Sequence, residues 1–412
     1  MANEITIDEA QKNLEEFING FNTNTRSVGK RRQVGISSRY STKSLSTRAE
    51  NENSPFVYIF NLGNKEGYAI VASDRRVTPV LAFTTEGELT KDSVIDNPGM
   101  IMFLSRAEDY INSVMARPLS VGIPNHNLDD GKDTFTPWET IVFDNSNMAC
   151  KVKWNQGNPY NKYCPLIKNE KDEIVHAVTG CVATATAQLM SIYQYPNQYK
   201  GYQFDWEEMN KIRIALPYFW MVDSIPTNQI ARLMVLLGDD NNLNMRYGVQ
   251  SYAQMTSIPR TLLNFGYTSG GVCKDYNTPT VVDELKNGYP VIAGGVDIID
   301  EDKFLGITVK RTGTGHTWLI NGLIERNRKH QYHDHYGNVD QEEIETKYYV
   351  LCNFGASGEH DGYYLSECFN LNRNPEISEG TRAISGNFEY GDIKGEETNY
   401  QYHLQTITGI RK

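Results

Sequence analysis

A cysteine at position 181 stands where a nucleophile is expected. It follows the small-residue turn Val178-Thr179-Gly180 and begins an alanine-rich segment without Gly or Pro before Pro196, which predicts a helix. Apolar residues recur at the spacings of three and four that mark a buried helical face: Val182, Ala185 and Leu189. A thiol in the first turn of a buried helix feels the partial positive charge of unpaired backbone N–H groups, which stabilises the thiolate. Cys181 is therefore a candidate nucleophile, and a small apolar core residue is the alternative.

A cysteine nucleophile needs a base, and eight histidines compete for that role. His316 follows Gly313-Thr314-Gly315 and begins the strand-like run Thr317-Trp318-Leu319-Ile320. Glycine before a histidine lets a substrate backbone approach closely, and the start of a strand holds the ring rigidly. We interpret His316 as the base, with a hydrogen-bonded histidine at a strand end as the alternative.

The other histidines fit this role less well. His126 lies in an irregular stretch, His360 beside a turn and His403 near the C-terminus. Three more share an insertion rich in asparagine and charge between two strand-like runs: His330, His333 and His335. We interpret this insertion as a solvated hairpin tip, with metal binding as the alternative, and we expect neither a metal nor a cofactor.

A glutamine ahead of the cysteine is a candidate oxyanion donor. Gln156 lies in Trp154-Asn155-Gln156-Gly157-Asn158-Pro159, about 25 residues before Cys181. A glutamine amide beside the backbone N–H of a nucleophile can stabilise an oxyanion. A glutamine in a turn rich in Gly, Pro and Asn is otherwise ordinary, so its position alone decides nothing.

The elements that must hold these residues suggest an α+β domain from about residue 151 to 412. Its first half favours helices: the segment from Cys181, then 230–237 and 260–265. Its second half favours an antiparallel sheet, with strand-like runs at 289–295, 316–323, 347–353, 362–365 and 400–407. Because helices come first and strands second, we expect a cleft where the two halves meet.

A smaller α+β unit precedes this domain. Residues 1–117 contain an amphipathic helix after Thr6, strand-like runs at 56–60, 68–72 and 80–83, and a second helix that begins at Asn97-Pro98 and ends before Pro118. About 115 residues is a normal domain size, and nothing in the unit is typical of catalysis. Residues 24–48 are basic and poor in apolar residues.

Residues 118–150 read as an exposed linker that separates the two domains. Periodicity is lost there and Pro, Asn, Asp and Gly become frequent. Exposed linkers are preferred sites of proteolytic cutting, and Arg117 and Lys132 are plausible positions.

Bulk properties exclude several functional classes. A formal net charge of -11 argues against a nucleic-acid partner or an anionic membrane. We expect no transmembrane segment, since no run of about 18 apolar residues occurs. Residues 1–4 carry no apolar export signal, although such a signal is removed from many mature chains. The six cysteines lack a CxxC pair, and a disulfide framework is not expected.

The segments 155–161 and 176–188, followed by Gly315-His316, resemble the streptopain family of bacterial cysteine proteases, which are papain-like. The resemblance extends more loosely to Gly67–Asp74, which is similar to the family's propeptide. It implies the proenzyme of a secreted or cell-surface protease with an N-terminal inhibitory prodomain. It also implies Cys181 as nucleophile, His316 as base and Gln156 as oxyanion donor, with Ser251 and Gly315 lining the substrate cleft.

The sequence departs from the family pattern after the histidine. The family usually has Asn-Trp-Gly-Trp-Gly-Gly, whereas this chain has Asn353-Phe354-Gly355-Ala356-Ser357-Gly358. Asn353 is kept and could orient the imidazole of His316. Phe354 keeps most of the first ring, and Ala356 loses the second, which puts specificity in doubt more than activity.

We therefore predict the zymogen of a secreted cysteine endopeptidase that hydrolyses proteins or peptides through a Cys181 thiolate and His316 imidazolium pair and is activated by proteolytic removal of the prodomain. The prodomain would act as an intramolecular inhibitor, and an activating protease is a possible partner. One alternative is an acyltransferase or transglutaminase, which uses the same Cys–His pair with an amine acceptor. The other is a binding protein that keeps a catalytically dead protease fold.

Overall fold

The protein is described here from a computed structural model. The model describes residues 3–24, 35–45, 55–116, 134–143, 146–214, 224–296, 303–310, 315–334, 336–370 and 403–412. Arg117, His126, Lys132 and His335 lie outside the described residues.

The helices begin and end close to the positions that the sequence predicts. Asn97 caps the second helix by accepting hydrogen bonds from the N–H groups of Gly99 and Met100, and Pro98 occupies the first helical position. The principal helices are α1 (Ile7–Asn24), α2 (Pro98–Met115), α3 (Cys181–Tyr193), α4 (Trp206–Lys211), α6 (Ile225–Leu237), α7 (Ile258–Asn264) and α8 (Thr278–Lys286). Three short 3-10 turns are η1 (Thr42–Leu45), η2 (Met255–Ser257) and η3 (Ser366–Phe369).

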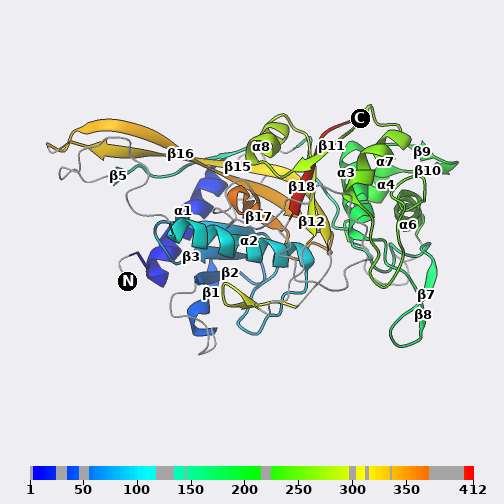
Figure 1. Ribbon diagram of the computed structural model, residues 1–412, viewed down its shortest axis with the longest axis horizontal. Helices are drawn as coiled ribbons and strands as arrows, with labels where there is room; N and C mark the ends of the chain where they lie inside the picture. The colour runs from blue at the N-terminus through cyan, green and yellow to red at the C-terminus, as the bar shows by residue number, and fades with distance from the viewer. Residues whose placement is uncertain are drawn as a thin grey trace, which may run out of the picture.

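One antiparallel sheet of twelve strands runs through the described part of the chain, in the order β1-β2-β3-β4-β17-β16-β15-β12-β18-β11, with β5 and β6 also paired to β15 (Figure 1). Its strands are β1 (Ile36–Ser41), β2 (Val57–Leu62), β3 (Tyr68–Ala72), β4 (Val80–Thr84), β5 (Thr134–Phe135), β6 (Glu139–Val142), β11 (Ser269–Asp275), β12 (Val291–Val296), β15 (His316–His333), β16 (Val339–Asn353), β17 (Gly362–Leu365) and β18 (His403–Arg411). Three two-stranded ribbons complete the strands: β7 (Leu166–Lys168) with β8 (Ile174–His176), β9 (Gln198–Tyr199) with β10 (Tyr202–Gln203), and β13 (Lys303–Phe304) with β14 (Ile307–Thr308).

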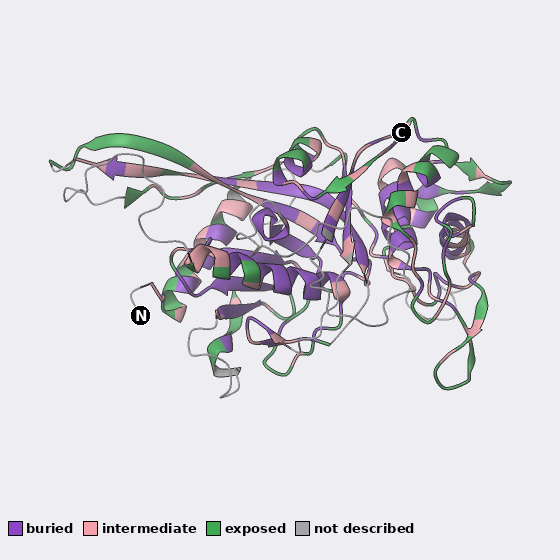
Figure 2. Ribbon diagram, viewed as in Figure 1, coloured by how far each residue is buried: buried purple, intermediate pink, exposed green. Residues whose placement is uncertain are grey.

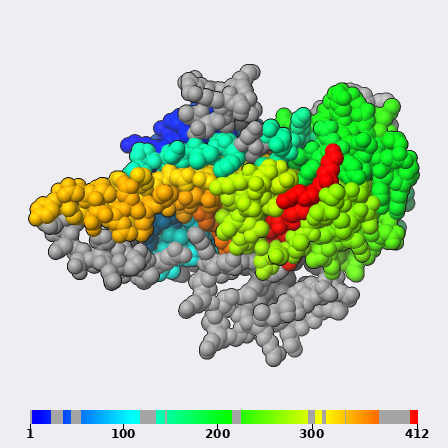
Figure 3. Space-filling view, turned by 90° about the horizontal axis from the view of Figure 1, so that it is seen from above, coloured from blue at the N-terminus to red at the C-terminus, as the bar shows by residue number. Residues whose placement is uncertain are grey.

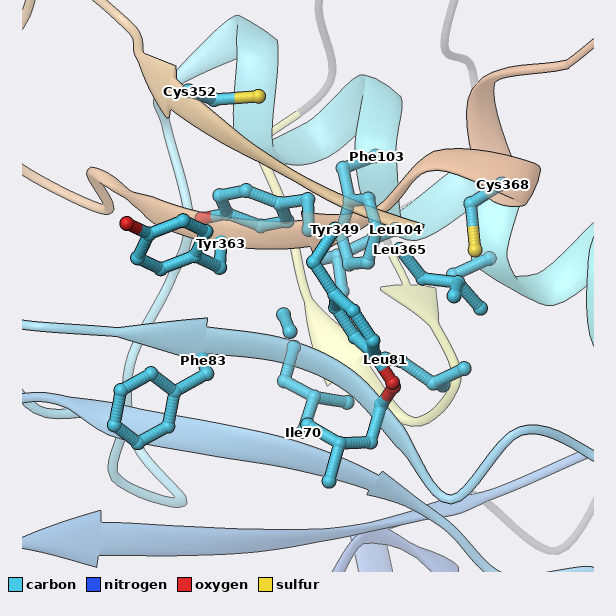
Figure 4. Close-up of a cluster of buried hydrophobic side chains, with 14 of the residues drawn as sticks. Ile70, Leu81, Phe83, Phe103, Leu104, Tyr349, Cys352, Tyr363, Leu365 and Cys368 are labelled. Carbon is cyan, nitrogen blue, oxygen red and sulfur yellow. The ribbon is translucent and has the colours of Figure 1, made fainter. Parts of the chain in front are cut away.

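The N-terminal strands join the sheet of the second half directly, because β4 pairs with β17 at Thr84–Gly362, Phe83–Tyr363 and Ala82–Tyr364. Buried apolar residues of both halves form one cluster. Figure 4 shows side chains of β3, β4 and α2 packed against those of β16, β17 and η3: Ile70, Leu81, Phe83, Phe103, Leu104, Tyr349, Cys352, Tyr363, Leu365 and Cys368. The N-terminal unit thus shares its core with the sheet, and the predicted domain boundaries at 117 and 150 remain a prediction.

The helical half has a second apolar cluster, in which α3, α6 and α7 pack together and against residues of β12, β15 and β18. In Figure 3 this half forms a rounded mass at one end of the molecule, and the orange strands extend from the other end. The helical half followed by the antiparallel sheet half confirms the predicted α+β class.

The arm, formed by β15 and β16, is longer than the sequence predicts. Strand pairing continues from Leu319–Asn353 to His333–Val339, so residues predicted as a hairpin tip lie within strands. In the outer part of the arm β16 is exposed, whereas β15 is mostly half-buried, and toward the sheet both strands become buried (Figure 2). The predicted hairpin is present, and His333 pairs with Val339 next to its turn. His330, however, belongs to a strand and stacks on Phe135 with ring centroids 4.2 Å apart, which corrects its placement at a solvated tip. No group of His, Cys, Asp and Glu suited to a metal occurs among the described residues.

Part of the predicted linker forms strands. The strap, residues 134–142, carries β5 and β6 along β15 and contacts α1. Thr140 within it is buried. Residues 134–135 and 139–142 are therefore strands, although most of their side chains are exposed. In the described residues, no helix is long and apolar enough to span a bilayer.

Candidate active site

Cys181 is the first residue of α3, as predicted, and is half-buried. The sulfur lies near the backbone and side chain of Thr317 and near the N–H groups of Cys181 and Val182. Burial raises the pKa of the Cys181 thiol, and these hydrogen bonds lower it only in part. The N–H groups at the helix N-terminus therefore act on the thiol as predicted, but burial outweighs them and the thiol is protonated in this state.

Gly180 brings the other predicted residues to the cysteine. Its φ of 84° is in the left-handed region, and an added Cβ would lie 2.8 Å from the sulfur of Met245 and 3.2 Å from the carbonyl oxygen of Ser251. The Ser251 hydroxyl accepts a hydrogen bond from the Gly248 N–H at 3.0 Å. The carbonyl oxygen of Gln156 accepts from the N–H of Thr179 at 3.0 Å, two residues before the cysteine. The backbones of Gln156 and Ser251 are thus held against the turn that begins α3.

His316 begins β15 and is only 4% exposed. Its Nε2 lies 2.8 Å from the carbonyl oxygen of Phe354. Because a carbonyl only accepts, Nε2 carries the proton and Nδ1 keeps its lone pair. The next residue, Thr317, is the neighbour of the Cys181 sulfur, and Gly315, the residue before His316, is half-buried. Strand β15 therefore brings Thr317, the residue after His316, to the Cys181 sulfur. No hydrogen bond recorded for the described residues joins the thiol and the imidazole.

Asn353 does not contact His316 in the way that the sequence suggested. Its amide nitrogen donates to the carbonyl oxygen of Val152 at 3.1 Å. Its Oδ1 accepts from the N–H of Gly355 at 3.1 Å. The group that orients the imidazole is instead the main-chain carbonyl of Phe354, so Asn353 reaches His316 only through the peptide bond between residues 354 and 355.

The environment of the site favours the neutral forms of the His316 imidazole and the Cys181 thiol. Burial lowers the pKa of His316 to about 4, and the hydrogen bond to Phe354 opposes this only in part. The imidazole is thus neutral near pH 7, as the thiol is. Apolar rings surround it, since Trp318 lies 6.2 Å and Phe354 6.4 Å from the ring centroid.

The first turn of α2 covers the imidazole. A Cβ added at Gly99 would overlap the ring of Phe354 and would lie 2.9 Å from Cδ2 of His316. The backbone of α2 therefore rests directly on these two side chains. Further contacts join the N-terminal unit to the same region: Tyr68 Oη lies 2.7 Å from Nδ1 of His360, and Glu86 forms ion pairs with Lys153 and Arg213.

Comparison with known proteins agrees with this geometry. The sequence profile of the peptidase C10 family matches residues 154–364, which is more than half of the chain and includes Cys181, His316 and Asn353. The chain belongs to the peptidase C10 family. A second profile, that of the Spi protease inhibitor, matches residues 2–111. The predicted resemblance to a streptopain proenzyme is confirmed.

Individual relatives are more distant. Streptopain of Streptococcus pyogenes is 29% identical over 217 residues, covering 51% of this chain and 48% of the relative. The thiol protease/hemagglutinin PrtT of Porphyromonas gingivalis is 29% identical over 154 residues, covering 37% of this chain and 17% of the relative. The chain spans about half the length of the curated streptopain relatives it matches. A solved fragment of prointerpain A from Prevotella intermedia is similar with a TM-score of 0.48 and 24% identity, covering 76% of this chain and 90% of the fragment.

Sequence reasoning missed three groups at the site. The Phe354 carbonyl has no side-chain signature, so only coordinates reveal it. Gly99 stands after a helix-initiating Asn-Pro pair, where a glycine reads as part of the cap. Thr317 lies in a strand-like run, where β-branched residues are expected for packing alone.

Proposed function

We propose that this chain is the zymogen of a cysteine endopeptidase. Cys181 is the nucleophile, His316 the base, and Gln156 with the Cys181 N–H the oxyanion donors. The observation that supports this proposal is the contact between the start of α3 and β15. It places the Cys181 sulfur beside Thr317, and the preceding residue, His316, has its Nε2 bonded to the carbonyl oxygen of Phe354. Such a histidine has Nδ1 free to take the thiol proton.

The reaction follows from these roles. His316 removes the proton from Cys181, and the thiolate attacks the scissile carbonyl to give an oxyanion held by Gln156 and the backbone N–H. The C–N bond breaks as His316 returns the proton to the leaving amine, which leaves a thioester. A water molecule deprotonated by His316 then hydrolyses the thioester and restores the thiol.

Residues 1–117 act in this proposal as an inhibitory prodomain and 118–150 as the activation segment. The contact of Gly99 with His316 and Phe354 supports inhibition by covering the base. Water and substrate are then kept from the imidazole, and burial keeps both reacting groups neutral. Cutting between residues 117 and 150, outside the strap, allows α2 to leave the imidazole of His316.

We also place the protein outside the cell, either secreted or at the cell surface, on the basis of the family resemblance. Protein or peptide substrates and an activating protease follow from the same resemblance. Fractionation of the cells that make the protein tests the location, and its recovery in the cytoplasm alone would contradict it.

The test of the function is mass spectrometry combined with a peptidase assay, before and after incubation with trypsin. We expect trypsin to raise activity as it cuts within 118–150, and we expect Cys181→Ala to fold and be cut but to lose at least about a hundredfold in rate. Activity of the Cys181→Ala protein equal to that of the unchanged protein would refute the assignment. Incorporation of a labelled amine in preference to hydrolysis would identify the transferase alternative, and no labelling of Cys181 by an epoxide reagent would identify the dead fold.

A further inference from the structure

The carbonyl that orients His316 is itself held from both sides. The N–H of Phe354 donates to Oδ1 of Asp361 at 2.9 Å, and the N–H of Gly355 donates to Oδ1 of Asn353 at 3.1 Å. These two N–H groups belong to the peptide planes on either side of the Phe354 Cα atom. The Phe354 carbonyl lies in the plane of the Gly355 N–H, which Asn353 holds, and Asp361 holds the preceding plane. Because each peptide is planar, fixing both planes fixes the direction of this carbonyl.

The loop that carries this carbonyl, residues 354–361, is tightly folded. Ser357 and His360 adopt left-handed φ values of 58° and 60° without being glycine. The loop is also tied down at its middle, where the Asn155 amide donates to the Ser357 hydroxyl at 2.7 Å. Asp361 closes the loop, and its carboxyl reaches back across it to the first residue.

Asp361 is unusual for an acidic residue, since its side chain is buried with only 6% exposed. Burial of a carboxyl costs free energy unless hydrogen bonds or charges compensate. The positive charges of Lys153 and Arg213 stabilise the ionised carboxyl, whereas the negative charge of Glu86, in the N-terminal unit, destabilises it. Nothing in the proposed chemistry of Cys181, His316 and Gln156 uses this carboxyl.

We propose that Asp361 is a positioning residue, which holds the Phe354 peptide so that its carbonyl presents His316 Nδ1 to Cys181. The proposal rests on the proposed function, since it takes His316 as the base. In place of the direct contact of Asn353 that the sequence suggested, it assigns the orienting role to the Phe354 carbonyl, held by Asp361 together with Asn353. It also implies that removal of the N-terminal unit takes away Glu86, the acidic neighbour of this carboxyl, and so favours the ionised, stronger acceptor.

The first experiment compares Asp361→Ala with Asp361→Asn in the trypsin-processed protein. Asparagine keeps an oxygen that accepts from the Phe354 N–H, and alanine does not. We expect Asp361→Ala to lower kcat per titrated Cys181 by roughly tenfold to a hundredfold with KM unchanged, because misplacement of a reacting group by about 1 Å has an effect of that order. We expect Asp361→Asn to recover most of this loss.

The matched control is Glu367→Ala, which removes another buried carboxyl, 6% exposed, on η3. We expect it to lower stability without changing kcat per titrated site. A purely structural role for Asp361 predicts the same behaviour for Asp361→Ala. The proposal is overturned if kcat per titrated site is unchanged in Asp361→Ala, or if Asp361→Asn loses as much as Asp361→Ala.

The second experiment does not depend on catalysis. In the full chain with Cys181→Ala, ¹⁵N-histidine spectra report which ring nitrogen of His316 carries the proton, and His316→Gln assigns the signal. We expect the Nε2–H form in this chain and in its Asp361→Asn variant, and a mixture of tautomers in its Asp361→Ala variant. An unchanged spectrum in Asp361→Ala rejects the positioning role even if the protein proves to have no peptidase activity, whereas absence of activity with the expected spectra rejects only the proposed function.

Discussion

At the scale of single residues, the site combines a thiol and an imidazole that are both neutral. Burial raises the pKa of Cys181 and lowers that of His316 to about 4. An ion pair of thiolate and imidazolium needs the opposite shifts. Because α2 excludes water from His316, removal of this helix changes the protonation of the site as well as its access. Under the proposed function, latency and activation therefore depend on how closely α2 packs against His316 and Phe354.

Gly99 is the residue at which this packing is tightest, and we predict that Gly99→Ala weakens it. The added Cβ overlaps the Phe354 ring and lies 2.9 Å from His316, so the helix must shift. Overpacking of this kind costs about 1–3 kcal/mol, which corresponds to an increase of roughly fivefold to more than a hundredfold in the uncovered fraction. The measurement is the rate at which an epoxide reagent labels Cys181 in the uncut chain, followed by mass spectrometry.

The control for this prediction is Gly35→Ala, which adds the same methyl group to the N-terminal unit where no atom lies within 4 Å. We expect the epoxide reagent to label Cys181 in the Gly35→Ala chain at the same rate as in the unchanged protein. Equal labelling rates for Gly99→Ala and Gly35→Ala would contradict the view that α2 covers the base.

The positions of the candidate residues Cys181 and His316 at the starts of a helix and a strand were predictable from the sequence, and the partners that surround them were not. Cys181 and His316 stand beside glycines at the start of a helix and a strand, which are local signals. The orienting carbonyl of Phe354, by contrast, depends on Asp361 closing a loop of residues with unusual backbone angles. Such a contact joins main-chain atoms, so residue types do not reveal it. For the same reason Asn353 was assigned a direct contact that the structure replaces with a main-chain one.

At the scale of elements, the predicted strands exist but several are longer than predicted. The apolar strand pattern in the sequence ends near Leu323, because the residues of the outer part of the arm are mostly charged or polar. Strand pairing continues there, and it is accompanied by cross-strand ion pairs such as Arg328–Glu345 and Lys329–Glu342. The strap was missed because its strands are short and one contains only two residues. Their partner residues on β15 lie about 180 to 200 positions away in the chain, a separation that local patterns do not report.

The strap is held by Arg326, which is 2% exposed. Its guanidinium lies 5.0 Å from the centroid of Phe17 on α1 and 5.1 Å from that of Trp138 on the strap, and Nε donates to the Thr140 hydroxyl at 3.2 Å. One arginine therefore joins the strap, α1 and β15. Cation–π contacts and hydrogen bonds of this kind contribute about 1–3 kcal/mol each when they are buried.

We predict that Arg326→Leu exposes the strap to proteolysis. Loss of these contacts lowers the free energy of opening the strap by about 2 kcal/mol. A protease specific for glutamate should therefore cut the uncut Arg326→Leu chain after Glu139 roughly thirtyfold faster than the unchanged chain. Arg232→Leu, which removes an arginine stacked 3.9 Å from the Tyr163 ring in the helical half, is the matched control. A cutting rate after Glu139 that is the same in both variants would show that Arg326 does not hold the strap.

At the scale of the whole molecule, the N-terminal unit and the second domain share one sheet and one apolar core. The side chains at the join, such as Phe83 and Tyr363, are buried on both sides of the β4–β17 pairing. Unfolding of the uncut chain is therefore expected to expose the buried histidines of the site together with the join. The pKa shifts of these histidines therefore contribute to the pH dependence of the free energy of unfolding of the whole uncut chain.

We predict from this linkage that the uncut chain loses stability as the pH falls from about 6.5 to 4. Burial lowers the pKa of both His316 and His360 to about 4 from 6.5, so the unfolded chain binds two more protons at these sites in that range. Asp361 acts in the opposite direction, since burial raises its pKa from 3.8 to about 7 and the folded chain binds one more proton there. Among these three groups the net difference is one proton in favour of the unfolded chain, which lowers the free energy of unfolding by about 1.4 kcal/mol per pH unit. Burial also raises the pKa values of Asp109 and Glu359, which reduces this slope toward the lower end of the range. Urea denaturation of the uncut Cys181→Ala chain at several pH values measures this slope. Adding His360→Asn, which tolerates the left-handed backbone, removes one of the two histidines and should bring the slope near zero; a slope that this substitution leaves unchanged would mean that His360 is not neutral and buried in the folded protein.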